Sequence, residues 1–302
     1  MALKDLKTKI RATGRTNKVT KAMEAVSAVK MRKSQQVALR GRPYARAALH
    51  ILSRISSGKL SHPVFIPRKV ARVLLIIITS DKGLAGNLNA GVLKMTEQAL
   101  LSRHISPENV TVYAIGRKGY DYCVRRGYTI LGYVENRRDD VTPDDFTLPG
   151  EQAFRLFGSG AVDEVLVAYT NFRSTFEQRP EIRTMLPFSM EALEKLVHDI
   201  TPSTGVWSDT SSDAPPPQYM FEPNEEVVLE ALLPKLAKIS LYHLLLESKA
   251  SEHSARMVAM KNASDKSREM QKDLLRSFNK ARQGLITREV SEIIGGIEAM
   301  SN

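Results

Sequence analysis

All fourteen prolines of this 302-residue chain lie between Pro43 and Pro234, so both ends of the sequence lack them. A proline inside an α-helix costs about 3 kcal/mol. Residues 1–42 and 235–302 are therefore predicted to form two long helices. At a rise of about 1.5 Å per residue they would extend roughly 60 and 100 Å, too far for the interior of one globular domain. We expect these helices to pack on each other as an antiparallel two-helix coiled coil.

Apolar residues in both terminal segments recur at spacings of three and four, the period of one helix face. In the first segment the predicted stripe consists of Leu3, Leu6, Ile10, Val19, Met23, Val26, Val29 and Val37. In the second segment the predicted seam consists of Met260, Ala263, Ser267, Met270, Leu274, Phe278, Ala281 and Leu285. The small residues in this seam would let two helices approach closely. The remaining polar surface is predicted to stay available for other chains.

The net charge of +11 is concentrated in the N-terminal segment. Residues 1–42 carry twelve Lys or Arg against Asp5 and Glu24, which gives +10 on one helix. Such charges lie closer together than the ~8 Å Debye length, so their potentials add and predict an acidic partner. The alternative to an acidic partner is that these charged side chains simply face solvent. Nucleic acid is less favoured, because its binding also needs base-reading or stacking groups and residues 1–42 contain no aromatic residue.

Strand and helix patterns alternate between the two terminal segments, which favours a mainly parallel sheet covered by helices. Strands are expected at 70–79, 110–115, 128–134, 164–171 and, on an edge, 179–186; helices are expected at 88–101, 116–126 and 151–157. The predicted organisation is a long helix over 1–60, an α/β domain over 65–200, a proline- and serine-rich linker over 201–222 and a long helix over 223–302.

Few residues of the sequence suggest catalysis or the binding of a phosphate or metal. The loop 81–87 follows a strand and precedes a helix, where doubly wound folds bind phosphates, but it lacks the G-x-G-x-x-G and P-loop spacings. A tight turn whose glycines adopt positive φ is favoured there. The six histidines are scattered without metal-ligand spacing, and the lone Cys123 is expected to be a packing residue. We therefore predict no catalytic, cofactor or metal site.

The chain is not expected to cross a membrane. Its longest strongly apolar run, 73–78, is far shorter than the roughly 20 residues of a membrane span. The first residues lack the apolar stretch of a secretory signal. Synthesis and residence in the cytoplasm are expected.

Three groups of residues closely resemble the gamma subunit of F-type, proton-translocating ATP synthases of the bacterial type. Residues 17–33 (NKVTKAMEAVSAVKMRK) resemble its N-terminal signature, and residues 79–89 (TSDKGLAGNLN) its central loop. Its C-terminal signature is resembled by residues 251–263 (SEHSARMVAMKNA), 279–283 (NKARQ) and 286–289 (ITRE). The resemblance spans essentially the whole chain in the expected order.

The resemblance implies a central-stalk rotor subunit that couples proton flow to ATP synthesis or hydrolysis by rotation. It implies a coiled coil inside a ring of alternating alpha and beta subunits, a Rossmann-like α/β domain as a foot near the membrane, and catalysis in other subunits. Further implied partners are the epsilon subunit and the membrane c-ring, with one copy of this chain per complex. The complex would be peripheral, on the cytoplasmic face of the inner membrane.

Nine residues are assigned to subunit interfaces by the resemblance alone. Met23, Lys30, Arg32 and Lys33 would face acidic loops of the beta subunits, and Arg256 would lie near loops of the ring. Arg282, Gln283, Thr287 and Glu289 would lie near the upper contact with the ring. Two alternatives stay open: a basic coiled-coil protein that binds nucleic acid, and an enzyme whose α/β middle binds a nucleotide.

Overall fold

The computed structural model describes residues 3–40, 63–136, 141–189, 222 and 224–301. The chain divides into two compact units. The first, the two-helix unit, comprises Met1–Ser27 and Arg256–Asn302; the second, the α/β unit, comprises Ala28–Ala255. Both units draw on two long helices, α1 (Leu3–Arg40) and α7 (Glu225–Ser301).

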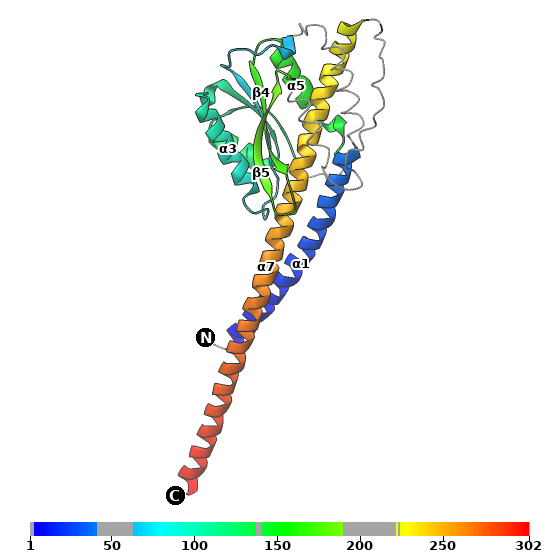
Figure 1. The fold of residues 1–302 in the computed structure, drawn as a ribbon. Helices are drawn as coiled ribbons and strands as arrows, with labels where there is room; N and C mark the ends of the chain where they lie inside the picture. The colour runs from blue at the N-terminus through cyan, green and yellow to red at the C-terminus, as the bar shows by residue number, and fades with distance from the viewer. Residues whose placement is uncertain (1–2, 41–62, 137–140, 190–221, 223, 302) are drawn as a thin grey trace. The chain divides into compact units, whose positions relative to one another are not determined.

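The α/β unit is built on a five-stranded sheet in the order β3-β2-β1-β4-β5 (Figure 1). The strands are β1 (Val73–Ile78), β2 (Val110–Ile115), β3 (Thr129–Val134), β4 (Glu164–Phe172) and β5 (Gln178–Leu186). Four of them are parallel, and β5 pairs antiparallel with β4 at the edge. The helices are α3 (Leu88–Ser102), α4 (Arg117–Arg125) and α5 (Thr147–Gly158), with short 3-10 helices η1 (Pro63–Phe65), η2 (Pro107–Asn109) and η3 (Pro143–Phe146).

Helices cover both faces of the sheet, which explains why β1 is an unbroken run of aliphatic residues rather than an alternating one. On one face, Leu74, Ile76 and Ile78 pack in a cluster with α5 and with residues 229–245 of α7. On the other face, the alternate residues Val73, Leu75 and Ile77 pack with α3 and α4. The central strand is therefore buried on both sides.

The predicted mainly parallel α/β fold between two long terminal helices is confirmed. The edge position of the last strand is also correct, and most boundaries agree within a few residues. The helix α7 begins at Glu225 and continues through Pro234, so it is longer than the proline-free segment 235–302 and close to the expected span 223–302. The predicted helical extension over 41–60 and the linker over 201–222 lie almost entirely outside the described residues.

One glycine is required where β2 passes into α4. Gly116 has φ +99°, and a Cβ added there would lie 2.0 Å from the carbonyl oxygen of Thr79. We predict that Gly116→Ala lowers the free energy of unfolding by about 3 kcal/mol, because both the left-handed backbone and the overlap are unfavourable. Gly158→Ala is the matched control, since an added Cβ there meets nothing within 4 Å. Equal urea midpoints for the two variants would contradict this prediction.

Candidate functional site: the two-helix unit

The two helices of the two-helix unit meet through small and polar side chains. The Asn17 side-chain amide donates hydrogen bonds to the Ser264 carbonyl oxygen at 2.6 Å and to Ser264 Oγ at 3.0 Å. One turn away, a Cβ added at Gly14 would lie 2.9 Å from Nε2 of Gln271. As α1 residue numbers fall, α7 numbers rise, so the pairing is antiparallel as predicted. This seam (Gly14, Asn17, Ser264 and Gln271, with Thr20 buried beside it) allows close approach.

The prediction of which α1 face is buried is partly wrong. Leu6 is buried, but Val19, Val26 and Val29 are exposed. Their neighbours Thr20 and Ser27 are buried instead, at the same seven-residue spacing. Successive helix residues differ by about 100° around the axis, so the buried stripe lies one residue away from the predicted valines.

The α7 seam is partly as predicted. Met260 is buried, and Ala263, Ser267, Leu274, Phe278 and Ala281 are half-buried. Met270 and Leu285, however, are exposed. Ser264, which is buried and bonded to Asn17, was missed because a hydrophobic pattern gives no weight to serine.

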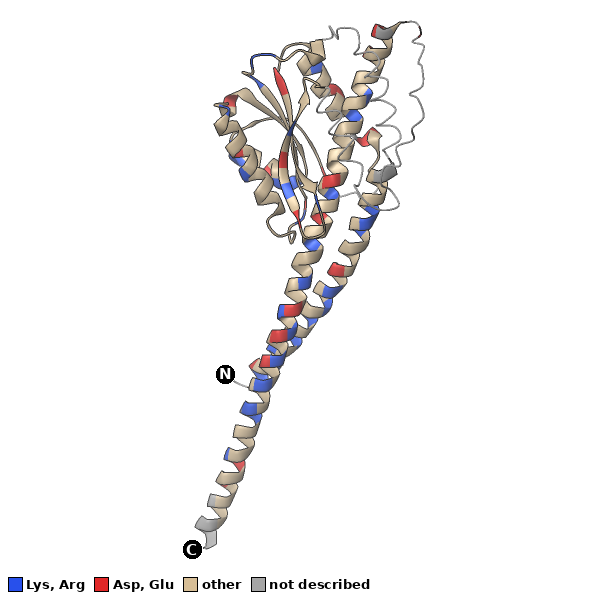
Figure 2. Cartoon of the chain, viewed as in Figure 1, with Lys and Arg blue, Asp and Glu red and all other residues tan. Residues whose placement is uncertain are grey.

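Lys and Arg residues recur along the N-terminal helix, where the ribbon in Figure 2 is coloured blue. Within the two-helix unit, seven Lys and Arg residues of α1 are exposed: Lys4, Lys7, Lys9, Arg11, Arg15, Lys18 and Lys21. On α7 the opposite charges alternate and pair along the helix, as in Lys266–Glu269 at 2.7 Å and Arg288–Glu292 at 2.9 Å. The positive potential therefore belongs mainly to α1.

The last turns of α7 carry a second feature that the sequence pattern did not predict. Six large aliphatic side chains are exposed between residues 285 and 297: Leu285, Ile286, Val290, Ile293, Ile294 and Ile297. In Figure 1 this part of α7 continues past the N-terminal end of α1. Exposed apolar side chains in such number on one element are typical of an interaction surface. We call these six residues the apolar end of α7.

The nine interface residues predicted by resemblance occupy the surface but form no single cluster. In the two-helix unit, Arg282, Gln283, Thr287 and Glu289 are exposed, while Met23 and Arg256 are half-buried. The Thr287 hydroxyl donates a hydrogen bond to the Gln283 carbonyl at 3.0 Å. In the α/β unit, Arg32 and Lys33 are exposed and Lys30 is half-buried. These positions suit contacts with other chains, which stay predictions.

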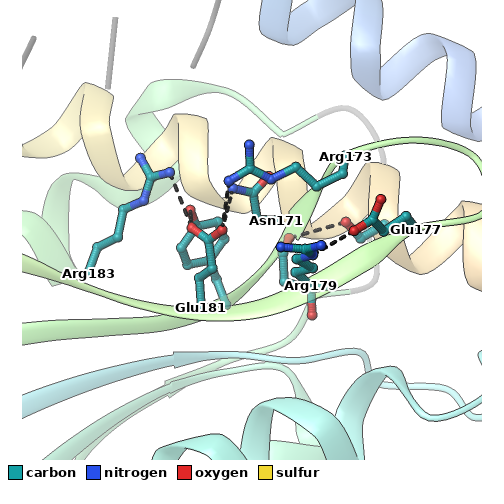
Figure 3. Close-up of polar contacts among 9 residues, drawn as sticks. Asn171, Arg173, Glu177, Arg179, Glu181 and Arg183 are labelled. Carbon is teal, nitrogen blue, oxygen red and sulfur yellow. Dashed lines mark hydrogen bonds and ion pairs between the residues drawn. The ribbon is translucent and has the colours of Figure 1, made fainter. Parts of the chain in front are cut away.

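A second polar arrangement lies on the β4–β5 hairpin of the α/β unit (Figure 3). The Glu181 carboxylate accepts hydrogen bonds from Asn171 at 2.9 Å, Arg173 at 3.1 Å, Tyr169 at 3.2 Å and Arg183 at 3.3 Å. Partial burial alone would raise the pKa of Glu181, but these hydrogen bonds and the Arg183 charge outweigh it and hold the pKa below its usual value. Sequence reasoning missed this cluster because its members meet only across paired strands.

The described part of the chain offers little for metal binding, thiol chemistry or membrane spanning. No group of three or more His, Cys, Asp or Glu residues is placed there to hold a metal ion. Cys123 is buried, and burial raises the pKa of its thiol to about 11, so it stays protonated at neutral pH. None of the described helices has the length and apolarity needed to span a bilayer.

A family model described as ATP synthase matches residues 2–300. The chain therefore belongs to the ATP synthase family. Within that family it is a gamma subunit.

Solved structures with the same fold include chains of two mitochondrial ATP synthases. A chain of the Euglena gracilis mitochondrial ATP synthase rotor, in rotational state 1, is 18% identical, has a TM-score of 0.62 and is matched over 94% of this chain and 98% of its own length. A chain from the OSCP/F1/c-ring structure of that enzyme, in rotational state 3, is also 18% identical, with a TM-score of 0.64 and coverage of 99% and 94%. A chain of the Tetrahymena thermophila mitochondrial central stalk and c-ring is 25% identical, with a TM-score of 0.57 and coverage of 82% and 99%.

The seam makes a prediction about stability. We expect Asn17→Ala to lower the free energy of unfolding by about 1–2 kcal/mol, because it removes two hydrogen bonds to Ser264 at a half-buried position. Lys18→Ala, on the exposed neighbouring position, is the control and should change it by less than about 0.5 kcal/mol. Chemical denaturation followed by far-UV circular dichroism measures both; equal midpoints would show that the seam bonds contribute nothing.

The hairpin cluster makes a prediction about pH. Because the folded state lowers the Glu181 pKa, ionised Glu181 stabilises the fold above its usual pKa of 4.5, and this contribution disappears as pH falls through the folded-state pKa. Glu181→Gln should therefore cost about 1–3 kcal/mol at pH 7 and progressively less below about pH 4. Glu177→Gln, at a more exposed carboxylate paired with Arg179, should cost little at either pH. A cost of Glu181→Gln that did not change with pH would contradict the assignment.

Proposed function

We infer that this chain is the central-stalk rotor subunit of an ATP synthase, coupling proton flow through a membrane sector to ATP synthesis or hydrolysis by rotation. The family match over residues 2–300 carries this inference. The two-helix unit supports it physically. A shaft that transmits torque needs continuous helices sealed along one seam, and a shaft that turns against other subunits needs an outer surface whose contacts break easily.

The surface of the two-helix unit suits a ring of catalytic alpha and beta subunits. Exposed ion pairs are worth about 0–1 kcal/mol each, so basic side chains on α1 can meet acidic loops and leave them again within one rotational step. Met23, Lys30, Arg32 and Lys33 are proposed to face such loops of the beta subunits, and Arg256 to lie near loops of the ring. Catalysis is proposed to reside in these partner subunits.

The apolar end of α7 suits a different kind of contact. A cluster of aliphatic side chains gains free energy from burial without fixed geometry, at about 25 cal/mol per Å². An apolar collar around these residues can therefore hold the helix end in place while it turns. Arg282, Gln283, Thr287 and Glu289 lie within or just before this stretch, and we propose that they contact the rim of the same collar.

The α/β unit is proposed to contact the epsilon subunit and the membrane c-ring, with one copy of this chain per complex. The complex is proposed to lie on the cytoplasmic face of the inner membrane. The alternatives of a nucleic-acid-binding coiled coil and of a nucleotide-binding enzyme are not favoured by any observation of fold or family.

Reconstitution tests the proposed function. Alpha and beta subunits combined with this chain should hydrolyse ATP and rotate an actin filament or bead fixed to this chain. Arg282→Ala with Gln283→Ala should lower ATP hydrolysis several-fold while the chain's own unfolding midpoint stays the same, because both side chains are exposed.

Lys272→Ala is the matched control, on an exposed charge of the same helix well before the apolar end. Rotation with unchanged hydrolysis in the double variant would remove the proposed role of Arg282 and Gln283. A complex of alpha and beta subunits that gained neither hydrolysis nor rotation from this chain would overturn the rotor function.

A further inference from the structure

The four parallel strands of the α/β unit begin level with one another, at one edge of the sheet. Val73, the first residue of β1, is opposite Val110 of β2 and Glu164 of β4. The chain therefore enters the sheet at this edge through four connections, which span residues 66–72, 101–109, 124–128 and 157–163. All four belong to the α/β unit. We call these four connections the amino edge.

Three of these connections expose large aliphatic side chains. Before β1, Ile66 is 50% exposed and Val70 is 41% exposed. Leu101, at the end of α3, is 72% exposed, and Val124, at the end of α4, is 49% exposed. A single exposed aliphatic residue needs no explanation. Their recurrence on separate connections to the same edge of the sheet indicates a surface that makes a contact.

The charge of the amino edge is positive. Its four connections contain six Lys or Arg against two Asp or Glu. Arg103 forms an ion pair with Glu164 at 2.8 Å. Arg126 forms an ion pair with Glu97, also at 2.8 Å. The unbalanced charge therefore lies mainly in residues 66–72, which contain three basic residues and no acidic residue.

The segment before β1 is fixed to the connection before β4. The Arg68 guanidinium donates a hydrogen bond to the Phe157 carbonyl at 2.8 Å and lies 4.5 Å from the centroid of the Phe157 ring. The Asp163 carboxylate accepts a hydrogen bond from the Arg72 amide at 2.8 Å. The Arg72 guanidinium donates to the Gly160 carbonyl at 2.7 Å and has further N–H groups for a ligand. The residues between the two arginines are therefore held in place although they are exposed.

This combination of side chains suits the surface of an anionic lipid bilayer. Helix dipoles account for basic residues at the ends of α3 and α4, but not for Lys69 and Arg72, which precede a strand. Lys and Arg attract lipid phosphates, and aliphatic side chains among them enter the headgroup region. A lipid surface is fluid, so side chains on separate connections need not match a fixed shape. A protein partner would need complementary packing against all of them.

We propose that the amino edge rests on the anionic lipid surface of the membrane. Lys69 and Arg72 attract lipid phosphates, while Ile66, Val70 and Leu101 enter the headgroup region. The contact is with lipid itself and is separate from the contacts proposed with the epsilon subunit and the c-ring. It rests on the proposed rotor function, because that function places the α/β unit beside a membrane sector. A fluid surface supports a turning unit without holding it at any one angle.

Co-sedimentation with vesicles tests the lipid contact. The complex of this chain with alpha and beta subunits is used, because there the basic side chains of α1 and the apolar end of α7 are proposed to be covered. It should sediment with vesicles of phosphatidylcholine and phosphatidylglycerol, and not with phosphatidylcholine alone. Lys69→Glu with Val70→Ser and Leu101→Ser should weaken this binding about tenfold or more, because one charge is reversed and two aliphatic groups are lost.

Lys94→Glu with Leu148→Ser is the matched control for this measurement. Lys94 is exposed in the middle of α3, and Leu148 is 58% exposed at the start of α5, away from the amino edge. This variant should bind the vesicles as the wild type does. Absence of wild-type binding to the anionic vesicles, or equal binding by the triple variant, would overturn the proposal.

Photo-cross-linking in the membrane-bound enzyme distinguishes lipid from protein. A benzophenone amino acid in place of Val70 should form an adduct with phospholipid, detected by mass spectrometry, and the same group in place of Leu148 should not. A cross-link from position 70 to a peptide of another subunit, without a lipid adduct, would show that a protein covers this edge and would refute the lipid contact. Hydrolysis and rotation by the soluble complex need no lipid, so they report on the rotor function separately.

Discussion

The close approach of α1 and α7 through small, polar side chains is the contact on which the character of the two-helix unit depends. Gly14, Asn17 and Ser264 occupy the places where a coiled coil would ordinarily place leucine or isoleucine. A seam of this kind is narrow, so it uses little of each helix circumference. The rest of the surface can then carry basic residues on α1 and, where α7 continues alone, aliphatic residues. A broad apolar seam would have taken up these positions and left less surface for other chains.

The α/β unit follows from its sequence to a large extent. The aliphatic run of β1 predicted a strand buried on both faces, and the alternation of strands and helices predicted parallel pairing. These signals are strong because they are local and repeated. The long helices were predicted from missing prolines. The helix α7 nevertheless contains Pro234 near its start, where packing of the flanking residues on the sheet offsets the local cost of the proline.

The candidate surfaces were harder to predict. On α1, the choice between the stripe with Val19 and Val26 and the stripe with Thr20 and Ser27 depends on which one lets the partner helix come close. Hydrophobicity alone ranks valine above threonine and so selects the wrong stripe. Likewise, Leu84 takes a conformation that residue preference assigns to glycine, and the partners of Glu181 come together only when β4 and β5 pair. Of the residues placed at interfaces by resemblance, six are exposed and Met23, Lys30 and Arg256 are half-buried. Their roles stay predictions, because the partners that would fix them are other chains.

The apolar end of α7 also affects how the free subunit behaves before it assembles into its complex. Six aliphatic side chains in the last turns of one helix make the newly synthesised subunit adhesive toward its own copies and toward any other exposed apolar surface. Prompt capture by partner subunits, or shielding by a chaperone, would remove that hazard. The same residues that are proposed to hold the helix end would thus set the order of events in biogenesis, with the receiving subunits needed early rather than last.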